Sequence, residues 1–353
     1  MTSDSLRALG ISPVLSSLFG DPDHSFPHLE PAQQADVLLV APATANLLAK
    51  MAWGLADDIL STQVLAFSGP TVVAPAMNPN MWHSAATQSN VAILRERGIL
   101  VLEPEAGDVA CGEVGRGRLP AGKEIGYNVL RSLAPRDMEG MRILVTLGPT
   151  REHLDPVRYW SNPSTGKMGA AMATAAWLRG AEVHCVCGPC SVDLPDGISV
   201  TSVQTALQMY EACTDLWSHQ DMACLCAAVC DFRPAYSYTE KIKKNRVPEG
   251  EMNLSFVPNP DILHTMGQNK KPFQRLIGFA AETGENLESE ARVKLDRKNL
   301  DWIVANRVDK KSGGFASEEN TVLVLGDAGH TENLGNDTKS DIAWRLWDLI
   351  LRS

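Results

Sequence analysis

The stretch RILVTLGPTREHLDPVRYWSNPSTGKMGAAMATAAWLRG, residues 142–180, says most about how this chain folds. It opens with an apolar run, 142–148, that has the length of a buried strand. It closes with an alanine-rich run, 168–180, that favours a helix. A polar loop containing Gly166 lies between them. Strand, loop and helix in this order predict a phosphate cradle, because the free N–H groups at the start of a helix attract anions.

The same alternation of apolar strands and helices runs through the whole chain. It predicts α/β architecture with two doubly wound, mainly parallel, Rossmann-like units. We expect a first domain at 1–125, a linker at 126–139 and a second domain at 140–353. Ligands of such folds bind in the loops beyond the carboxyl ends of the strands. The runs expected to form strands are 36–41, 71–76, 99–104, 142–148, 181–188, 222–229, 274–282, 300–306 and 321–326.

Composition excludes several classes of protein. Hydrophobic residues make up 44% of the 353 residues and charged residues 21%, which is typical of a globular protein and not of a disordered one. The net charge of −10 argues against a general nucleic-acid binder. No apolar run is long enough for a membrane span, and the N-terminus has no signal peptide. With eight cysteines and no export signal, a reducing cytoplasm is the expected location.

Six of the cysteines form two runs, and zinc binding is one interpretation of them. Both runs lie in or beside apolar, strand-like segments, where buried thiols are common. Buried free cysteines are therefore favoured over zinc ligands. The two runs are Cys185, Cys187 and Cys190, and Cys224, Cys226 and Cys230.

Three loops of the first domain carry residues that suit ligand binding. After the strand 36–41, Pro42 is expected to end the strand, and Thr44 and Asn46 stand at a helix entry. There they suit an anion or a polar ring edge, although ordinary helix capping by Thr44 explains them as well. The glycine-rich stretch 103–122 contains Cys111 and suits a mobile flap that brings an acid to a substrate.

The loop after the strand 71–76 has an unusual composition. Asn78 suits hydrogen bonding to a carboxylate or an amide. Its apolar neighbours suit the wall of a flat cofactor, and the alternative is a loop packed on its own side chains. These neighbours are Met77, Met81 and Trp82.

The ordered motifs PATAN, ADDILST, PAMNPNMW and ACGEVGRGR resemble those of the flavin-dependent cysteine decarboxylases, in the order found in phosphopantothenoylcysteine decarboxylases. The resemblance implies that FMN oxidises the substrate thiol, after which the carboxylate leaves as CO₂. It implies that His28 is the family's histidine, that Asn78 holds the carboxylate and that Cys111 donates a proton during the final reduction. The residues that it places at FMN are Thr44, Asn46 and Met77.

The resemblance starts inside the family's domain. In that family the domain opens with a strand and a Gly/Ser-rich loop that binds the FMN phosphate. This chain begins after these features, so we expect a flavodoxin-like domain that lacks its first strand and its phosphate loop.

The second domain lacks the common nucleotide motifs. Lys167 is followed by Met168, which excludes a P-loop, and no G-x-G-x-x-G is present. Asp231 directly follows an apolar strand and precedes a basic run. An Asp beside cations suits a triphosphate with Mg²⁺, although a solvated basic loop is the ordinary alternative. The cations are Lys241, Lys243, Lys244 and Arg246, with Lys294 and Lys298 four residues apart on a helix.

Residues 140–353 resemble the phosphopantothenate–cysteine ligases, in the CTP-using bacterial form that is fused to the decarboxylase. The motifs are GPTRE, DPVRYWSNPSTGKMG, AAVCDFRP, EKIKK, PNPDIL, GFAAET and KNLDWIVAN. The resemblance implies that Asn162 holds an acyl-cytidylate, that Arg158 serves the cysteine step and that Lys241 neutralises the departing pyrophosphate. It implies a CTP and Mg²⁺ site formed by Asp231, Pro260, Asp261, Ile262, Leu263, Phe279, Lys294 and Lys298.

The leading hypothesis is therefore a bifunctional enzyme of coenzyme A biosynthesis. Its substrates are 4′-phosphopantothenate, cysteine and CTP, and its product is 4′-phosphopantetheine. One alternative is a working ligase whose flavin domain is inactive. Another, of a different class, is a non-enzymatic regulatory or assembly subunit. The resemblance also implies a ligase dimer and flavin-domain trimers.

Overall fold

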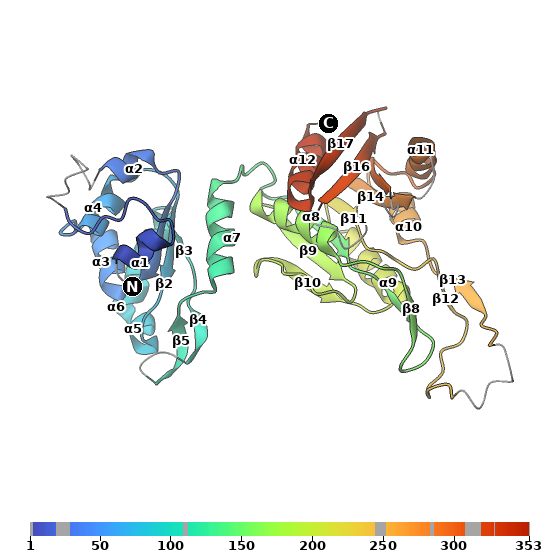
Figure 1. Cartoon of the computed structure of the whole chain (residues 1–353), viewed down its shortest axis with the longest axis horizontal. Coiled ribbons are helices and arrows are strands. Elements are labelled where there is room, and N and C mark those ends of the chain that lie inside the picture. Colours follow the sequence, from blue (N-terminus) through green and yellow to red (C-terminus); the bar gives the residue numbers. More distant parts are fainter. Residues whose placement is uncertain are drawn as a thin grey trace. The chain divides into compact units, whose positions relative to one another are not determined.

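The computed structural model divides the chain into two compact units, Met1–Ala134 and Pro135–Ser353. It describes residues 3–18, 29–108, 112–243, 252–282, 286–307, 319–327 and 329–352. The boundary lies inside the expected linker of 126–139, and helix α7 (Gly122–Leu133) occupies the first part of that linker. Figure 1 labels most of the elements of both units.

Within its described residues, the first unit has a parallel sheet of three strands in the order β1-β2-β3, as expected. Its other β structure is an antiparallel hairpin of β4 and β5. The strands are β1 (Leu38–Ala43), β2 (Thr71–Pro75), β3 (Leu100–Val101), β4 (Glu105–Asp108) and β5 (Val114–Arg118). The helices besides α7 are α1 (Ser3–Ala8), α2 (Glu30–Gln34), α3 (Ala45–Trp53), α4 (Ile59–Ala66), α5 (Pro79–His83) and α6 (Ala85–Glu96).

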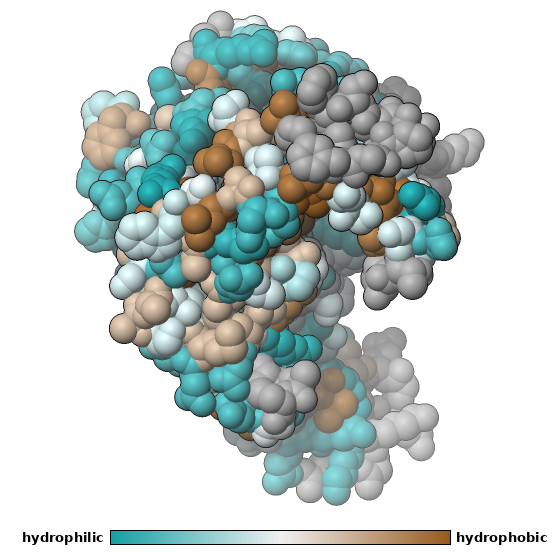
Figure 2. All heavy atoms as spheres, turned by 90° about the vertical axis from the view of Figure 1, so that its left-hand side faces the viewer, coloured by the Kyte–Doolittle hydropathy of each residue, from teal (hydrophilic) through white to brown (hydrophobic). Residues whose placement is uncertain are grey.

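Strand β2 is buried on both faces, which explains why its sequence is continuously apolar. Val73 packs in one core cluster with residues of α3 and α6, such as Leu48 and Leu94. Val72 packs on the opposite face in a cluster that includes Ile125 of α7. The sheet of the first unit is therefore covered by helices on both sides. On the face shown in Figure 2, apolar side chains occur in separate groups among polar ones.

The prediction that Pro42 ends the first strand is wrong. Strand β1 continues to Ala43, and its pairing with β2 shifts register between Val40 and Ala43. This irregularity lets Pro42 lie within the strand, because proline has no N–H to donate to a regular ladder of hydrogen bonds.

The second unit confirms the predicted mainly parallel α/β fold. Among its described residues, eight strands form one sheet in the order β10-β9-β6-β11-β14-β15-β16-β17. All neighbours up to β15 are parallel, whereas β16 and β17 add to the edge in antiparallel pairing. The parallel strands are β6 (Arg142–Leu147), β9 (Glu182–Cys187), β10 (Ser199–Ser202), β11 (Met222–Leu225), β14 (Arg275–Glu282) and β15 (Trp302–Arg307), followed by β16 (Glu319–Gly326) and β17 (Thr331–Thr338).

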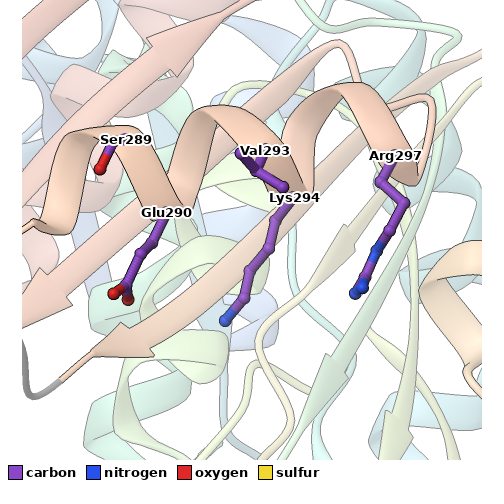
Figure 3. Close-up of a pocket in the computed structure, with 5 residues that line it drawn as sticks. All are labelled: Ser289, Glu290, Val293, Lys294 and Arg297. Carbon is purple, nitrogen blue, oxygen red and sulfur yellow. The ribbon is translucent and has the colours of Figure 1, made fainter.

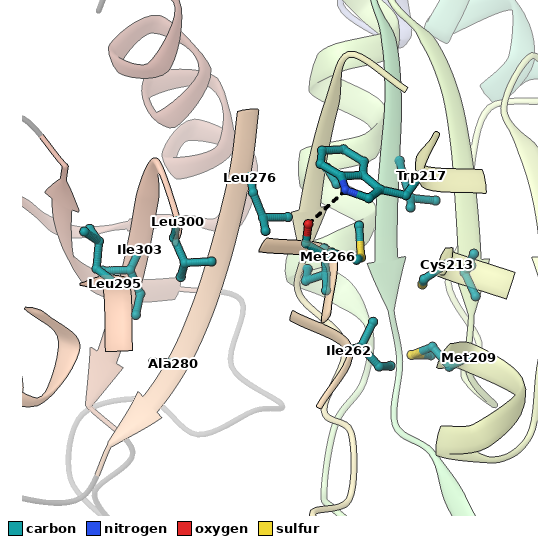
Figure 4. Close-up of a cluster of buried hydrophobic side chains, with 14 of the residues drawn as sticks. Met209, Cys213, Trp217, Ile262, Met266, Leu276, Ala280, Leu295, Leu300 and Ile303 are labelled. Atoms are coloured by element: carbon teal, nitrogen blue, oxygen red, sulfur yellow. Dashed lines mark hydrogen bonds between the residues drawn. The ribbon is translucent and has the colours of Figure 1, made fainter. Parts of the chain in front are cut away.

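Helices cover both faces of this sheet. Helices α9, α10 and α11 share one core cluster, in which the indole N–H of Trp217 donates to the carbonyl of Met266 at 3.0 Å (Figure 4). Helices α8 and α12 pack together, and the indole N–H of Trp347 donates to the carbonyl of Met172 at 3.0 Å. The helices are α8 (Lys167–Leu178), α9 (Ala206–Trp217), α10 (Ile262–Gln268), α11 (Leu287–Arg297) and α12 (Lys339–Leu351).

Two short antiparallel hairpins extend from the second unit. One joins β7 (Arg151–His153) to β8 (Tyr159–Ser161), and the other joins β12 (Phe232–Pro234) to β13 (Phe256–Pro258). They contact each other through Trp160 and Phe256, whose rings meet edge to face at 5.5 Å between centroids. None of the helices in the described part of the chain combines the length and hydrophobicity that crossing a membrane requires.

Candidate functional site

The strand order of the second unit creates a crevice between β6 and β11. From β6 the chain continues to β9, its neighbour toward one edge of the sheet. From β11 it continues to β14, the neighbour toward the opposite edge. In open α/β sheets, ligands bind where the strand order reverses in this way. A cavity of about 470 Å³ lies there, at the carboxyl ends of β6, β11, β14 and β15. Its described lining includes the predicted residues Asn162, Asp231, Phe279 and Lys294.

The first turn of α8 forms one wall of this cavity. The helix begins after Gly166, which has φ 77° and therefore adopts a left-handed conformation that favours glycine. Gly169 also lines the cavity, and a Cβ there would lie 2.5 Å from that of Leu147. Without side chains at these points, the helix starts close to the end of β6. Its amide groups and positive dipole end favour an anionic ligand in the cavity.

Asn162 also lines the cavity and is held by segments that follow two strands of the sheet. Its side-chain amide nitrogen donates to the carbonyl of Val229 at 3.0 Å, beyond β11. The hydroxyl of the preceding Ser161 donates to the carbonyl of Thr150 at 2.7 Å, beyond β6. These two bonds fix the segment that enters the cavity from β8.

The two lysines predicted to share a helix face are both paired with acidic residues, although only Lys294 lies within α11 and Lys298 is its C-cap residue. Lys294 forms an ion pair with Glu282 at the end of β14. Lys298 forms one with Asp261 at 2.9 Å between Nζ and Oδ2. Burial raises the pKa of Asp261, but hydrogen bonds from the His264 N–H and from Lys298 outweigh it, and the net pKa lies below its ordinary value. The positive charge of each lysine is therefore neutralised by a carboxylate beside it.

Lys294 also borders a second, open groove of about 330 Å³ along α11. Figure 3 shows Glu290, Lys294 and Arg297 extending from the same side of that helix. Lys298, by contrast, lies outside the described lining of the larger cavity, as do Asp261, Arg158 and Lys241. The structure therefore separates the predicted ligase residues into a cavity group and a flanking group.

Arg158 and the chain beside Lys241 belong to the flanking group and touch each other. The guanidinium of Arg158 donates to the carbonyl of Ile242 at 3.2 Å. It also pairs with Asp155, at 3.4 Å between Nη1 and Oδ2. Lys244 and Arg246, which belong to the predicted basic run, lie outside the described residues.

In the first unit, the predicted FMN residues lie at the carboxyl ends of β1 and β2. The hydroxyl of Thr44 caps α3 by accepting from the N–H of Leu47 at 3.3 Å, and Asn46 is exposed in the first turn. Met77 is half-buried, and its N–H donates to the carbonyl of Gly117 on β5 at 2.9 Å. The hairpin therefore lies next to these strand ends.

Asn78 is the N-cap of α5 and contacts the flap. Its side-chain oxygen accepts from the N–H groups of Asn80, at 2.8 Å, and Met81, at 3.4 Å. Its amide nitrogen donates to the carboxylate of Glu113 at 2.9 Å. Trp82 does not suit a cofactor wall, because it is 2% exposed and belongs to the apolar core. His28 and Cys111 lie outside the described residues.

The described cysteines are all free thiols, and four of them are buried: Cys185, Cys213, Cys224 and Cys230. Cys226 lines the cavity, and its sulfur lies 3.5 Å from that of Cys224. Burial raises the pKa of Cys213 to about 12. Within the described residues, no three His, Cys, Asp or Glu side chains are grouped so that they could hold a metal ion.

Three acidic residues of these sites were not identified from the sequence, namely Glu113, Asp155 and Glu282. The first two stand inside the motifs ACGEVGRGR and DPVRYW, and the third inside GFAAET. Each side chain contacts a predicted site residue. Position within a motif was the only signal in the sequence, because their roles depend on contacts between distant segments.

Fold and cavity define a two-unit α/β protein whose second unit has a crevice suited to a nucleotide. The family model "DNA/pantothenate metabolism flavoprotein C-terminal domain" matches residues 138–353, and the model "Flavoprotein" matches residues 12–133. Together the two models cover nearly the whole chain.

Relatives with similar sequences cover the chain equally well. The coenzyme A biosynthesis bifunctional protein CoaBC of Vibrio cholerae is 42% identical over 354 residues, covering 99% of this chain and 87% of that protein. That of Bacillus subtilis is 40% identical over 345 residues, covering 96% and 84%. The chain belongs to this family of bifunctional coenzyme A biosynthesis proteins.

A solved structure is similar to the second unit. The crystal structure of the C-terminal domain of a CoaBC protein has 36% identity and a TM-score of 0.52, covering 62% of this chain and 97% of that one. This likeness supports the fold described above.

Proposed function

We propose that the protein carries out two successive reactions of coenzyme A biosynthesis. The second unit joins cysteine to 4′-phosphopantothenate at the expense of CTP. The first unit decarboxylates the resulting phosphopantothenoylcysteine to 4′-phosphopantetheine with FMN. The observation that carries the proposal is the cavity at the reversal of strand order, with the start of α8, Asn162, Asp231 and Lys294 around it.

The cavity offers what a nucleoside triphosphate requires. The N-terminus of α8 and the ammonium of Lys294 attract the phosphates, and Phe279 adds an apolar wall. Asp231 is the one predicted carboxylate in the described lining, and we assign it to Mg²⁺. Mg²⁺ is commonly held by one or two carboxylates together with substrate phosphates, so a single protein carboxylate fits this ion.

In the ligase reaction, a carboxylate oxygen of phosphopantothenate attacks the α-phosphorus of CTP, and pyrophosphate leaves. The amine of cysteine then attacks the acyl carbon, an amide bond forms and CMP leaves. We assign Asn162 to holding the acyl-cytidylate and Lys241 to balancing the charge of the departing pyrophosphate. Arg158 serves the cysteine step. The remaining nucleotide contacts are assigned to Pro260, Asp261, Ile262, Leu263 and Lys298.

The first unit offers a site for FMN at the carboxyl ends of β1 and β2. Thr44, Asn46 and Met77 lie at these ends and would hold it. One observation supports a substrate site beside it: the amide of Asn78 already binds a carboxylate, that of Glu113. Bound FMN would supply the two-electron oxidation and return the electrons later. Asn78 would hold the substrate carboxylate, and we assign proton transfer to Cys111 and a catalytic role to His28.

We further propose that the protein works in the cytoplasm as a homo-oligomer, with ligase dimers and flavin-unit trimers, and without nucleic-acid partners. Exposed aromatic side chains on the two hairpins of the second unit support an interface. Trp160 is 58% exposed and Phe232 55%.

A product analysis tests the proposal. The chain is incubated with 4′-phosphopantothenate, cysteine, CTP, Mg²⁺ and FMN, and the masses of the products are read. Phosphopantetheine, which is lighter than phosphopantothenoylcysteine by CO₂, is the expected product. Phosphopantothenoylcysteine alone would restrict the function to the ligase. If neither product forms, the non-enzymatic role is the remaining alternative.

A further inference from the structure

We propose that Asp155 is a positioning residue of the ligase centre. Through one buried carboxylate it holds Arg158 and the segment 241–243, which come from distant parts of the chain, in a single arrangement. The inference rests on the proposed ligase function, which assigns Arg158 to the cysteine step and Lys241 to pyrophosphate departure. It concerns how these two residues are kept together.

One oxygen of Asp155 shapes the turn that carries Arg158. This oxygen, Oδ1, accepts from the N–H of Val157 and from the N–H of Arg158, both at 2.8 Å. The turn joins β7 to β8, and β8 leads directly to Asn162 in the cavity. The backbone that presents Arg158 is therefore set by the carboxylate of Asp155.

The other oxygen, Oδ2, reaches the segment of Lys241. It accepts from the N–H of Ile242 at 3.2 Å and lies 3.4 Å from Nη1 of Arg158. Arg158 Nη2 in turn donates to the carbonyl of Ile242 at 3.2 Å. Asp155, Arg158 and Ile242 thus form a closed ring of contacts. Lys241 precedes Ile242 directly, so its backbone position depends on this ring.

Burial makes Asp155 the fixed member of the ring. Asp155 is 1% exposed, whereas the side chain of Arg158 is 44% exposed. Burial raises the pKa of Asp155, but the hydrogen bonds from Val157, Arg158 and Ile242 outweigh it and hold the net pKa below its ordinary value. A buried carboxylate with several donors stays ionised and immobile, and it restrains the two exposed segments that bind to it.

The variant Asp155→Asn distinguishes the contacts made by Oδ1 from those made by Oδ2. The amide oxygen of Asn can still accept from Val157 and Arg158, so the turn is retained. Its NH₂ group then faces the N–H of Ile242 and the guanidinium of Arg158, which are both donors. We expect kcat for ligation to fall by about tenfold or more, with KM for CTP little changed, because Asp155 lies outside the described lining of the cavity.

Asp301→Asn is the matched control. Asp301 is also buried, at 4% exposed, and its carboxylate binds Lys270 at 2.8 Å and the N–H of Leu276 at 2.7 Å. The substitution Asp301→Asn removes a buried, paired carboxylate that lies away from the site. We expect this variant to lower Tm while kcat of the folded protein stays near that of the wild type.

A double-mutant cycle with Arg158→Gln distinguishes positioning from a structural role. The cycle measures capture of cysteine by the preformed acyl-cytidylate. If Asp155 acts through Arg158, the double variant is no slower than Arg158→Gln alone. Additive losses, or a loss of kcat that merely follows the folded fraction, would overturn the proposal.

Hydrogen exchange of the full chain gives a readout that does not depend on activity. Peptides covering 238–243 should exchange faster in Asp155→Asn and unchanged in Asp301→Asn. If Asp155→Asn does not fold, the exposed Arg158→Gln variant should still speed exchange there, because it removes the bond to the Ile242 carbonyl. Unchanged exchange would refute the ring as a restraint. A wild-type protein that does not ligate would instead refute the proposed function and the catalytic part of this inference with it.

Discussion

The carboxylate of Glu113 accepts a hydrogen bond of 2.9 Å from the side-chain amide of Asn78. The amide oxygen of Asn78 is engaged by the N–H groups of Asn80 and Met81, so its NH₂ group is the part turned toward Glu113. Asn78 therefore presents a donor to an anion, as a residue that binds a substrate carboxylate must. The flap supplies such a carboxylate through Glu113.

Replacing Glu113 by Gln should strengthen substrate binding by the first unit. The carboxylate of Glu113 competes for the Asn78 amide, and a neutral side chain competes less well. We expect KM for phosphopantothenoylcysteine to fall severalfold in steady-state decarboxylation assays. Glu105→Gln is the control, because Glu105 lies on the same hairpin and accepts from the N–H of Ala121 at 2.7 Å, which Gln can also do. An unchanged or higher KM would contradict the competition.

Asn78→Asp should abolish decarboxylation while leaving α5 intact. Aspartate is as good an N-cap as asparagine, so the bonds to Asn80 and Met81 can be kept. It presents an acceptor in place of the NH₂ group and repels a substrate carboxylate. We expect a loss of about a hundredfold or more in kcat/KM, the effect of replacing a charge-assisted contact by a repulsion. Ligation by the same protein is the internal control and should be unchanged; retained decarboxylation would remove Asn78 from the site.

Lys294→Gln should raise KM for CTP by about tenfold, because it removes a cation from the cavity wall and leaves Glu282 without its ion-pair partner. Initial rates of CTP consumption at varied CTP concentration give this value. Lys271→Gln is the control for a change of net charge, since Lys271 donates to the carbonyl of Ser218, at the end of α9. If both variants raise KM equally, the effect is general charge and Lys294 is not a ligand.

The pH dependence of the first unit should include a contribution from Asp58, the N-cap of α4. Hydrogen bonds from Lys50 and then from Ser61 lower its pKa from 3.8 to about 2. A lowered pKa in the folded state stabilises the fold above the ordinary pKa, and the stabilisation is lost as pH falls from about 4 to about 2. Hydrogen exchange of peptides covering 59–66 should show α4 opening more readily across this range.

Asp58→Asn should remove most of the loss of stability between about pH 4 and about pH 2, because asparagine keeps the cap but not the charge. Asp57→Asn should keep this loss, since Asp57 pairs with Lys50 without capping the helix. Asp58→Ala should cost about 1 kcal/mol at neutral pH through loss of the cap. If the wild type and Asp58→Asn lose stability equally over this pH range, the loss comes from other carboxylates.

Most of the parallel strands could be predicted from their apolar runs, because strands buried on both faces are apolar throughout. The parallel strand β10 could not, because it lies at the edge of the sheet and its sequence, SVTS, has no buried residue. Strand β17 could not be predicted either. Its sequence, TENLGNDT, is polar, and Leu334 is its one buried residue. It is the last strand of the sheet and pairs with a single neighbour, so little hydrophobic pattern is required of it. Hairpin β7–β8 escaped prediction for a similar reason, since polar contacts such as those of Asp155 hold it.

Asp231 could be predicted from the residues themselves, because it follows an apolar strand of the large sheet. Asn162 and Phe279 were predicted through the resemblance: Asn162 follows β8 of a separate hairpin, and Phe279 lies within β14. Their partners could not be predicted in the same way. Ile242 binds Asp155 across 87 positions of the chain, and Glu113 binds Asn78 across 35. Such pairings follow from the path of loops, which hydrophobic periodicity does not describe.

The ion pairs of Lys294 with Glu282 and of Lys298 with Asp261 bear on how the affinity for the proposed nucleotide would respond to ionic strength. An unpaired cation attracts bulk anions, and a polyphosphate that displaces them binds more weakly as salt is added. Here the bound counterion is a carboxylate of the same chain. A triphosphate bound at Lys294 or Lys298, as proposed, would displace a carboxylate that stays tethered to the chain, and would release fewer ions to solution. The affinity of such a site falls less steeply with added salt than that of a site built from unpaired lysines.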